Sequence, residues 1–167
     1  MLGALAVLVV PPAVGIASSA SWNSAAVPLG GVPVIIQSDP VSCGPAVIAT
    51  LASWLAEPLT EADVLTAAKN AGAFGETGIS LAEFARLASL FDLPGTWFQV
   101  ARQDLKRLAM PFVAHLEGRN GGHFVAVLAM RHGFAVVADP ASGAYVGSLE
   151  ATLPGFSGRV YLLRDAA

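Results

Sequence analysis

The chain has 167 residues, of which 54% are hydrophobic and 13% are charged, and its formal net charge at pH 7 is −3. This composition is typical of one compact globular domain and excludes a disordered chain. Lysine and arginine do not cluster along the sequence, so the chain lacks the attraction for phosphate that nucleic-acid binding requires. A nucleic-acid partner is therefore not expected.

The first twenty residues carry no charged side chain, and their apolar run ends in small residues. This is the pattern of a signal peptide cleaved after Ala20, so we expect residues 1–20 to direct export to the periplasm, the cell envelope or the medium. Two prolines interrupt the run and no Lys or Arg precedes it. A retained N-terminal anchor with weak membrane association is therefore the first alternative, and a cytoplasmic N-terminal strand is the second. No later segment reaches the length of about 18 to 20 apolar residues that crosses a bilayer.

Residues 21–31 are small and polar with one proline and two glycines, which predicts a linker. The folded domain is then expected over residues 32–167, beginning with a β-branched strand at 32–37. Three helices should follow, the first with a proline in its first turn and the other two with capping-box patterns at their starts. They are predicted to cover 43–57, 60–72 and 80–91.

The second half of the chain changes to short apolar runs separated by turn-like segments, which predicts strands. These strands are expected at 96–100, 111–117, 123–130, 134–139 and 159–165, with a short helix at 102–109. Helices followed by an antiparallel meander indicate an α+β fold rather than the strand–helix alternation of a parallel sheet.

Cys43 is the only cysteine, so it forms no disulfide within the chain and excludes zinc sites that need two or more cysteines. It stands at the predicted start of a helix, where the unpaired N–H groups of the first turn favour an anion such as a thiolate. That position suits a nucleophile. A small buried packing residue is the alternative, and for a free cysteine taken alone it is the commoner role.

A histidine and an aspartate shift this balance. His123 opens one predicted strand and Asp139 closes the next, so a hairpin of these two strands places the two side chains together. An imidazole oriented by a carboxylate, combined with a thiol, is the arrangement used in nucleophilic catalysis. Gln37 lies just before the cysteine turn and can direct an amide N–H toward an oxyanion formed beside Cys43, but taken alone it is better explained as a polar residue that ends a strand.

Four stretches resemble, in order, the motifs of the papain-like peptidase domain that removes double-glycine leader peptides from bacteriocins and is often fused to ABC transporters. The resemblance runs from about Val32 to Arg164 and rests on QSDPVSCGPAVIATL, GISLAEFARLA, MPFVAHL and GGHFVAVLAMRHGFAVVADPASG. It implies a papain-like cysteine peptidase fold, with N-terminal helices packed on an antiparallel sheet. No ATPase or transmembrane domain follows in the sequence, so a stand-alone member is expected.

The resemblance also implies a role for each matching residue. Cys43 would be the nucleophile, His123 the general base and acid, and Asp139 the partner that orients the histidine. Gln37 and the backbone N–H of Cys43 would donate to the oxyanion. Ser42 departs from the pattern, because many members have Asp before the cysteine, but this position lies outside the triad.

The function that follows is a cysteine peptidase that cleaves after small residues such as Gly-Gly in a leader peptide. Its expected partners are a peptide or protein substrate and a separate peptide exporter, and no cofactor is expected. One alternative keeps the fold as a catalytically silent peptide-binding module. Another is a thiol acyltransferase, in which an amine instead of water captures the acyl-enzyme.

The remaining candidate residues are assigned structural roles. His115 lies within a predicted strand and is expected to be structural or to line the cleft, whereas His132 lies in a turn and is expected to be solvated. Trp54 and Trp97 are expected to pack in the core. The histidines lack the spacing of a metal-binding motif, so no metal site is predicted.

Overall fold

The computed structural model of the protein describes residues 27–28, 31–55, 57–118 and 122–164, so the predicted signal peptide at 1–20 lies outside the described residues. The described helices and strands are β1 (Val27–Pro28), α1 (Cys43–Trp54), α2 (Glu61–Asn70), α3 (Leu81–Leu90), β2 (Gly95–Gln99), the 3-10 helix η1 (Arg102–Arg107), β3 (Phe112–Leu116), β4 (His123–Arg131), β5 (Phe134–Asp139), β6 (Gly143–Ser148), α4 (Leu149–Thr152) and β7 (Phe156–Leu163).

The three predicted helices form, and local sequence signals set their starts. Thr60 and Ser80 each complete a capping box with an acidic side chain three residues later, at the starts of α2 and α3. Each serine or threonine oxygen accepts a backbone N–H that the helix itself leaves unpaired, which fixes the first turn. None of the described helices has the length and apolarity needed to span a membrane.

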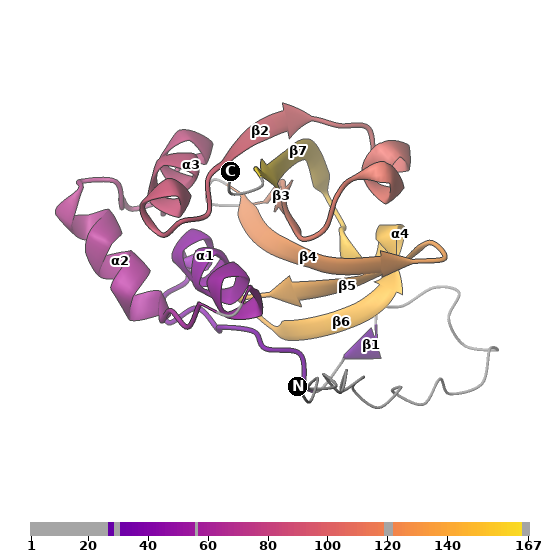
Figure 1. The fold of residues 1–167 in the computed structure, drawn as a ribbon, viewed down its shortest axis with the longest axis horizontal. Coiled ribbons are helices and arrows are strands. Elements are labelled where there is room, and N and C mark those ends of the chain that lie inside the picture. Colours follow the sequence, from indigo (N-terminus) through magenta and orange to yellow (C-terminus); the bar gives the residue numbers. More distant parts are fainter. Residues whose placement is uncertain (1–26, 29–30, 56, 119–121, 165–167) are drawn as a thin grey trace, which may run out of the picture.

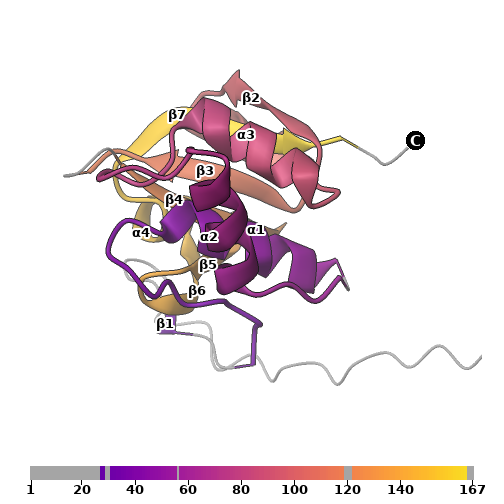
Figure 2. The same cartoon turned by 90° about the vertical axis from the view of Figure 1, so that its left-hand side faces the viewer.

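The strands form one sheet in the order β1-β6-β5-β4-β3-β7-β2, and every neighbouring pair is antiparallel. Strands β3 to β6 form a meander, and β7 returns to lie between β3 and β2 (Figure 1). Helices α1, α2 and α3 lie together on one side of this sheet, with α1 packed against β4 (Figures 1 and 2). The predicted α+β fold with N-terminal helices on an antiparallel sheet is confirmed.

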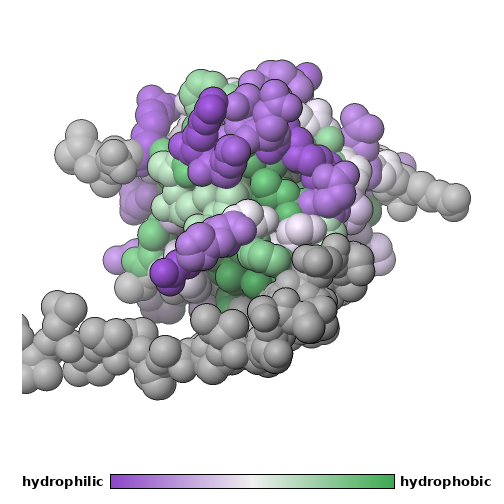
Figure 3. All heavy atoms as spheres, turned by 90° about the vertical axis from the view of Figure 1, so that its right-hand side faces the viewer, coloured by the Kyte–Doolittle hydropathy of each residue, from purple (hydrophilic) through white to green (hydrophobic). Residues whose placement is uncertain are grey.

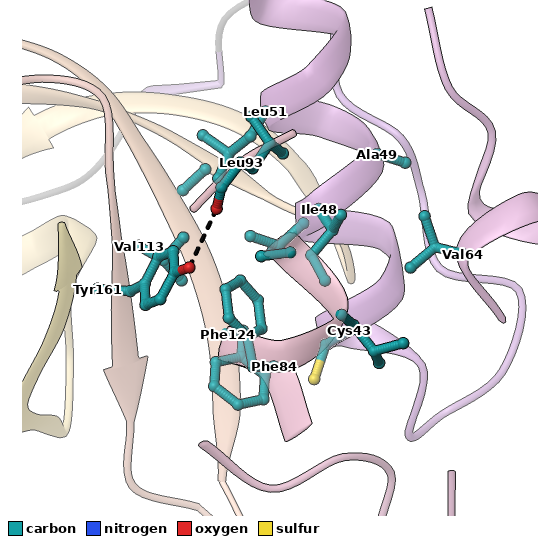
Figure 4. Close-up of a cluster of buried hydrophobic side chains, with 14 of the residues drawn as sticks. Cys43, Ile48, Ala49, Leu51, Val64, Phe84, Leu93, Val113, Phe124 and Tyr161 are labelled. Carbon is teal, nitrogen blue, oxygen red and sulfur yellow. Dashed lines mark hydrogen bonds between the residues drawn. The ribbon is translucent and has the colours of Figure 1, made fainter. Parts of the chain in front are cut away.

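Successive side chains of each strand point to opposite faces of the sheet, and apolar side chains on both faces form two separate hydrophobic cores. The first core lies between the sheet and α1 and α3, and its buried side chains include Ile48, Leu51, Phe84, Leu87, Phe124 and Tyr161 (Figure 4). The second core lies on the opposite face beside η1 and α4, and it includes Leu105, Phe112, Val125, Val127, Val137 and Leu153. From the side of η1 and α4, hydrophilic side chains surround a smaller apolar area (Figure 3).

The strand predicted at 32–37 is wrong, because this segment has no regular secondary structure. Two hydrogen bonds hold it instead: the Ile35 N–H donates to Thr50 Oγ1 at 3.0 Å, and the Gln37 N–H donates to the Pro140 carbonyl at 2.9 Å. Since one acceptor is a helix side chain and the other belongs to a turn, the segment follows the surface of the domain without entering a strand ladder.

Neither β6 nor α4 is predicted from the sequence. The β6 segment GAYVGS has two glycines and a serine, which is a turn-like composition, yet it pairs with β5 along its whole length. Its other edge pairs with Val27–Pro28, two residues of the predicted linker. Trp54 also differs from expectation, because 39% of its surface is exposed at the end of α1.

Candidate active site

Cys43 is the first residue of α1, and only 6% of its surface is exposed. It belongs to the first core, where its sulfur points toward the rings of Phe84 and Phe124 (Figure 4). The thiol is therefore a reduced, nearly buried group at a helix N-terminus. The N–H groups of that helix end favour a negative charge on the sulfur.

His123 and Asp139 lie side by side at the start of β4 and the end of β5, where the hairpin register brings these strand ends together. His123 Nε2 and Asp139 Oδ1 are 2.8 Å apart. The same carboxylate accepts the Ala141 N–H at Oδ1 and the Ser142 hydroxyl at Oδ2, both at 2.8 Å. These contacts fix the carboxylate, and the carboxylate in turn fixes the plane of the imidazole.

The charges of this pair support one another. Burial disfavours the imidazolium, but hydrogen bonds to Asp139 and Cys43 and the negative charges of both groups outweigh it and raise the pKa of His123 to about 9. Burial likewise disfavours the Asp139 carboxylate, but the hydrogen bond from His123, the Ala141 N–H and the imidazolium charge hold its pKa below the ordinary value. At neutral pH the structure therefore favours a protonated imidazole beside an ionised carboxylate.

The histidine lies between the carboxylate and the thiol. Its Nε2 is occupied by Asp139, so Nδ1 is the ring nitrogen that remains available to Cys43, which is one of the groups that raise the pKa of His123. The three side chains thus form a chain in which the carboxylate is hydrogen-bonded to the imidazole and the thiol, at a helix start, lies near the ring. Such a chain can move a proton between sulfur and a reacting group while the ring stays in place.

Gln37 lies beside this chain and is tied to it through the backbone, because its N–H donates to the carbonyl of Pro140, the residue after Asp139. Its side-chain Nε2 donates to the Asp39 carbonyl at 2.8 Å. Among the described residues, Gln37 Oε1 is buried and has no hydrogen-bond partner. One N–H of the amide is thus occupied by the Asp39 carbonyl, which leaves the second N–H for another acceptor.

The other two histidines lie apart from this chain. His115 Nδ1 lies 3.0 Å from Ser157 Oγ, and the His115 ring packs edge-on against the Phe124 ring with the two centroids 5.3 Å apart. His132 is exposed in the turn between β4 and β5. Trp97 packs against Phe84 and the first core.

One contributor to the site is not found from the sequence. Glu61, the first residue of α2, is a buried carboxylate that accepts hydrogen bonds from the Ser38 N–H and the Ser42 hydroxyl, on either side of the cysteine turn. In the sequence it reads as an ordinary acidic residue in a first helical turn, which the helix dipole favours. Its contacts with the cysteine turn become visible only in the structure, where α2 packs against α1.

Residues 31–167 match the sequence model of the peptidase C39 family. The chain belongs to the peptidase C39 family. It is therefore a cysteine-type peptidase, as its motifs predict. Among curated proteins, none matches this C39 chain in sequence.

Solved structures share the C39 fold. The peptidase domain of Streptococcus ComA, a bi-functional ABC transporter involved in a quorum sensing pathway, is 19% identical with a TM-score of 0.69, over 81% of this chain and 99% of that one. A double glycine motif protease from an AMS/PCAT transporter, in complex with the leader peptide, is 22% identical with a TM-score of 0.66, over 79% of this chain and 90% of that one. A C39-like peptidase from Bacillus anthracis is 12% identical with a TM-score of 0.58, over 86% of this chain and 100% of that one.

Proposed function

We propose that this C39 peptidase hydrolyses peptide bonds through a triad of Cys43, His123 and Asp139, with Gln37 as an oxyanion donor. The observation that carries the proposal is the 2.8 Å contact between the Asp139 carboxylate and the His123 ring, together with a nearly buried thiol at a helix start that helps to raise the pKa of that ring. A carboxylate, an imidazole and a thiol in this order have the roles of an orienting group, a base and a nucleophile.

Acylation begins with the thiolate–imidazolium pair of Cys43 and His123. The sulfur attacks the substrate carbonyl, and the carbonyl electron pair moves onto oxygen as the C–S bond forms. The Gln37 amide and the backbone N–H of Cys43 stabilise that oxyanion. The C–N bond then breaks, His123 gives its proton to the leaving amine, and a thioester remains.

Deacylation uses the same groups in reverse. His123 takes a proton from a water molecule, whose oxygen attacks the thioester carbonyl. The second oxyanion collapses, the C–S bond breaks, and the carboxylic acid product leaves the Cys43 thiolate beside the protonated ring. Throughout the cycle Asp139 keeps the ring in one orientation and stabilises its positive charge.

For the substrate, we propose a peptide with small residues such as Gly-Gly before the cleaved bond. Only 6% of the Cys43 surface is exposed, so a substrate carbonyl reaches the sulfur only through a restricted opening, which favours residues without bulky side chains. The AMS/PCAT neighbour is a double glycine motif protease in complex with the leader peptide, and its shared fold is consistent with this class of substrate. A separate peptide exporter is the partner that such processing would serve.

The proposal is tested with a peptide that contains Gly-Gly before the cleaved bond and a thiol-directed probe that ends in Gly-Gly. Cys43→Ala should abolish both labelling and cleavage, because it removes the nucleophile. His123→Ala should lower kcat/KM by about 10²–10⁴-fold, which is the usual contribution of acid–base catalysis. Absence of labelling by the wild-type protein under reducing conditions at neutral pH would rule out the peptidase and favour a peptide-binding module. A product that forms only when an amine is added would identify an acyltransferase.

We also infer that the protein is exported, because residues 1–20 are apolar, uncharged and followed by small residues. The intact mass of the protein recovered from its host tests this directly. A mass that corresponds to residues 21–167 supports removal of a signal peptide, whereas the full mass in the membrane fraction supports a retained anchor.

A further inference from the structure

Glu61 connects the two ends of the cysteine turn. Its carboxylate accepts the Ser38 N–H with both oxygens, at 2.9 and 3.1 Å, and accepts the Ser42 hydroxyl at 2.5 Å. Ser38 follows Gln37 and Ser42 precedes Cys43, so one carboxylate binds the direct neighbours of the nucleophile and of the proposed side-chain oxyanion donor. Only 8% of the Glu61 surface is exposed, and that of Ser42 is fully buried.

The Ser42 hydroxyl is diverted from the role that its position predicts. Serine at an N-cap normally accepts an N–H of the first helical turn, as Ser80 does at α3 and as Thr60 does at α2. Ser42 makes no such bond, and its φ and ψ of −93° and 20° differ from the extended values of the other two caps. Its hydroxyl instead donates to the Glu61 carboxylate at 2.5 Å and lies 3.0 Å from the Asp39 carbonyl, and its oxygen accepts the Asp39 N–H at 3.1 Å.

This arrangement leaves the start of α1 open. The third residue of the helix is Pro45, which has no N–H, so the first turn offers the N–H groups of Cys43 and Gly44. A capping serine would compete for one of them. Because the Ser42 hydroxyl is held by Glu61 and by Asp39, it caps neither N–H group, and both stay available at the end of the helix where Cys43 stands.

We propose that Glu61 is a positioning residue for the oxyanion hole. It would hold the Gln37 segment and the start of α1 at a fixed separation, so that the Gln37 amide and the Cys43 N–H meet the same substrate oxygen. This inference rests on the proposed peptidase function, in which the C–S bond forms as the carbonyl electrons move to oxygen. Glu61 itself touches neither substrate nor sulfur in this role, and it acts through Ser38 and Ser42.

The test compares three variants of the full chain with the wild type. Glu61→Ala removes all three contacts. Glu61→Gln keeps the shape and one oxygen that can accept the Ser38 N–H, but it removes the charge. Asp63→Ala is the matched control, because it removes a carboxylate from the same turn of α2 whose contacts are to Thr60 alone and not to the cysteine turn.

Three measurements separate the oxyanion hole from the nucleophile. Hydrolysis of a Gly-Gly peptide and inhibition by a peptide aldehyde both require a stabilised tetrahedral oxygen, whereas alkylation of Cys43 by iodoacetamide does not. For Glu61→Ala we expect kcat to fall roughly 10- to 100-fold with KM little changed, because donors displaced by a fraction of an ångström lose much of their effect. Aldehyde inhibition should weaken by the same factor, and the alkylation rate should stay at the wild-type value. Glu61→Gln should recover part of the loss, and Asp63→Ala should match the wild type.

Three results would overturn the inference. Unchanged hydrolysis in Glu61→Ala would show that the hole forms without Glu61. An equal loss of hydrolysis and alkylation would show a general distortion of α1, and an equal loss in Asp63→Ala would show that the start of α2 matters only for stability. If Glu61→Ala does not fold, Ser42→Ala and Glu61→Gln give the same comparison. A wild-type protein that is neither active nor inhibited by the aldehyde would instead refute the proposed function itself.

Discussion

Asp139 has three hydrogen-bond donors around one carboxylate: the His123 ring, the Ala141 N–H and the Ser142 hydroxyl. Burial works against its negative charge, but these donors and the imidazolium hold its pKa below the ordinary value. The ionised carboxylate is in turn one of the groups that raise the pKa of His123 to about 9. The charge of Asp139, as well as its shape, therefore sets the protonation state of the neighbouring ring.

Asp139→Asn tests this dependence at the scale of one residue. Asparagine keeps an oxygen that can accept the Nε2 proton but lacks the charge, so we expect the pKa of His123 to fall from about 9 toward its ordinary value of 6.5. NMR titration of the His123 ring measures this shift. Glu150→Gln removes one negative charge at an exposed position and should leave the titration unchanged. A His123 pKa near 9 in Asp139→Asn would contradict the assignment.

The same substitution should change stability in a pH-dependent way. The raised pKa of His123 contributes to stability in full below pH 6.5, and this contribution is lost as pH rises through about 9. The lowered pKa of Asp139 contributes above its ordinary value of 3.8 and is lost at lower pH. The difference in unfolding free energy between wild type and Asp139→Asn should therefore be largest between pH 3.8 and 6.5 and should shrink above 9. Urea unfolding at a series of pH values measures this difference. A difference in unfolding free energy that does not change with pH would show that His123 and Asp139 are not coupled.

The His123–Asp139 contact could be predicted from the sequence because it depends on one hairpin register. Two apolar runs joined by a short turn place the start of one beside the end of the other. The link between Gln37 and Pro140 and the reach of Glu61 could not be predicted in this way. Both join segments far apart in the chain, and no period or spacing in the sequence carries that information.

At the scale of elements, the sequence predicts those features that depend only on residues close together in the chain, such as helix starts. The capping boxes at Thr60 and Ser80 set the starts of α2 and α3. The β-branched residues at 32–37 predict a strand, yet the hydrogen-bond partners of this segment lie on α1 and in the turn after β5. Strand β6 was missed for the opposite reason, since pairing with β5 outweighs its turn-like composition.

The loop between α2 and α3 packs closely on the cysteine turn. Gly78 has a φ of +84°, and a Cβ at this residue would lie 2.3 Å from the Val41 carbonyl oxygen, two residues before Cys43. The next residue, Ile79, packs against the start of α1, where a Cβ on Gly44 would lie 2.5 Å from Ile79 Cδ1. The loop therefore supports the cysteine turn from outside the sheet.

Two glycine substitutions separate the effect of this contact from that of backbone conformation. Gly72 has a φ of +63° with no atom within 4 Å of a Cβ position, so Gly72→Ala should cost only about 1–2 kcal/mol of left-handed strain and leave activity unchanged. Gly78→Ala carries the same strain and also displaces the backbone at Val41, so it should lower kcat/KM as well as stability. Urea unfolding and peptide hydrolysis of both variants provide the comparison. Equal activity in the two would show that the loop does not support the site.

At the scale of the whole molecule, the two hydrophobic cores on opposite faces of the sheet differ in whether they contact the candidate active site. The first core contains Cys43 itself, and Phe84 packs on Phe124, the residue after His123, with ring centroids 5.0 Å apart. The second core, which contains Leu105, stabilises the sheet from the opposite side. Both cores stabilise the fold, but only the first contains Cys43, the proposed nucleophile.

A substitution in each core tests this division. Leu105 is fully buried in the second core, so Leu105→Ala should lower the unfolding free energy by about 2–5 kcal/mol through lost contacts and a cavity. Its kcat/KM should stay at the wild-type value at temperatures where the variant is folded, because Cys43 belongs to the first core and not to the second. Phe84→Leu removes less volume but releases the Phe124 ring, so its kcat/KM should fall even though it destabilises the fold less. Urea unfolding combined with hydrolysis assays distinguishes the two effects. If both variants lost activity only in proportion to the unfolded fraction, the packing of Phe84 would have no part in holding the site.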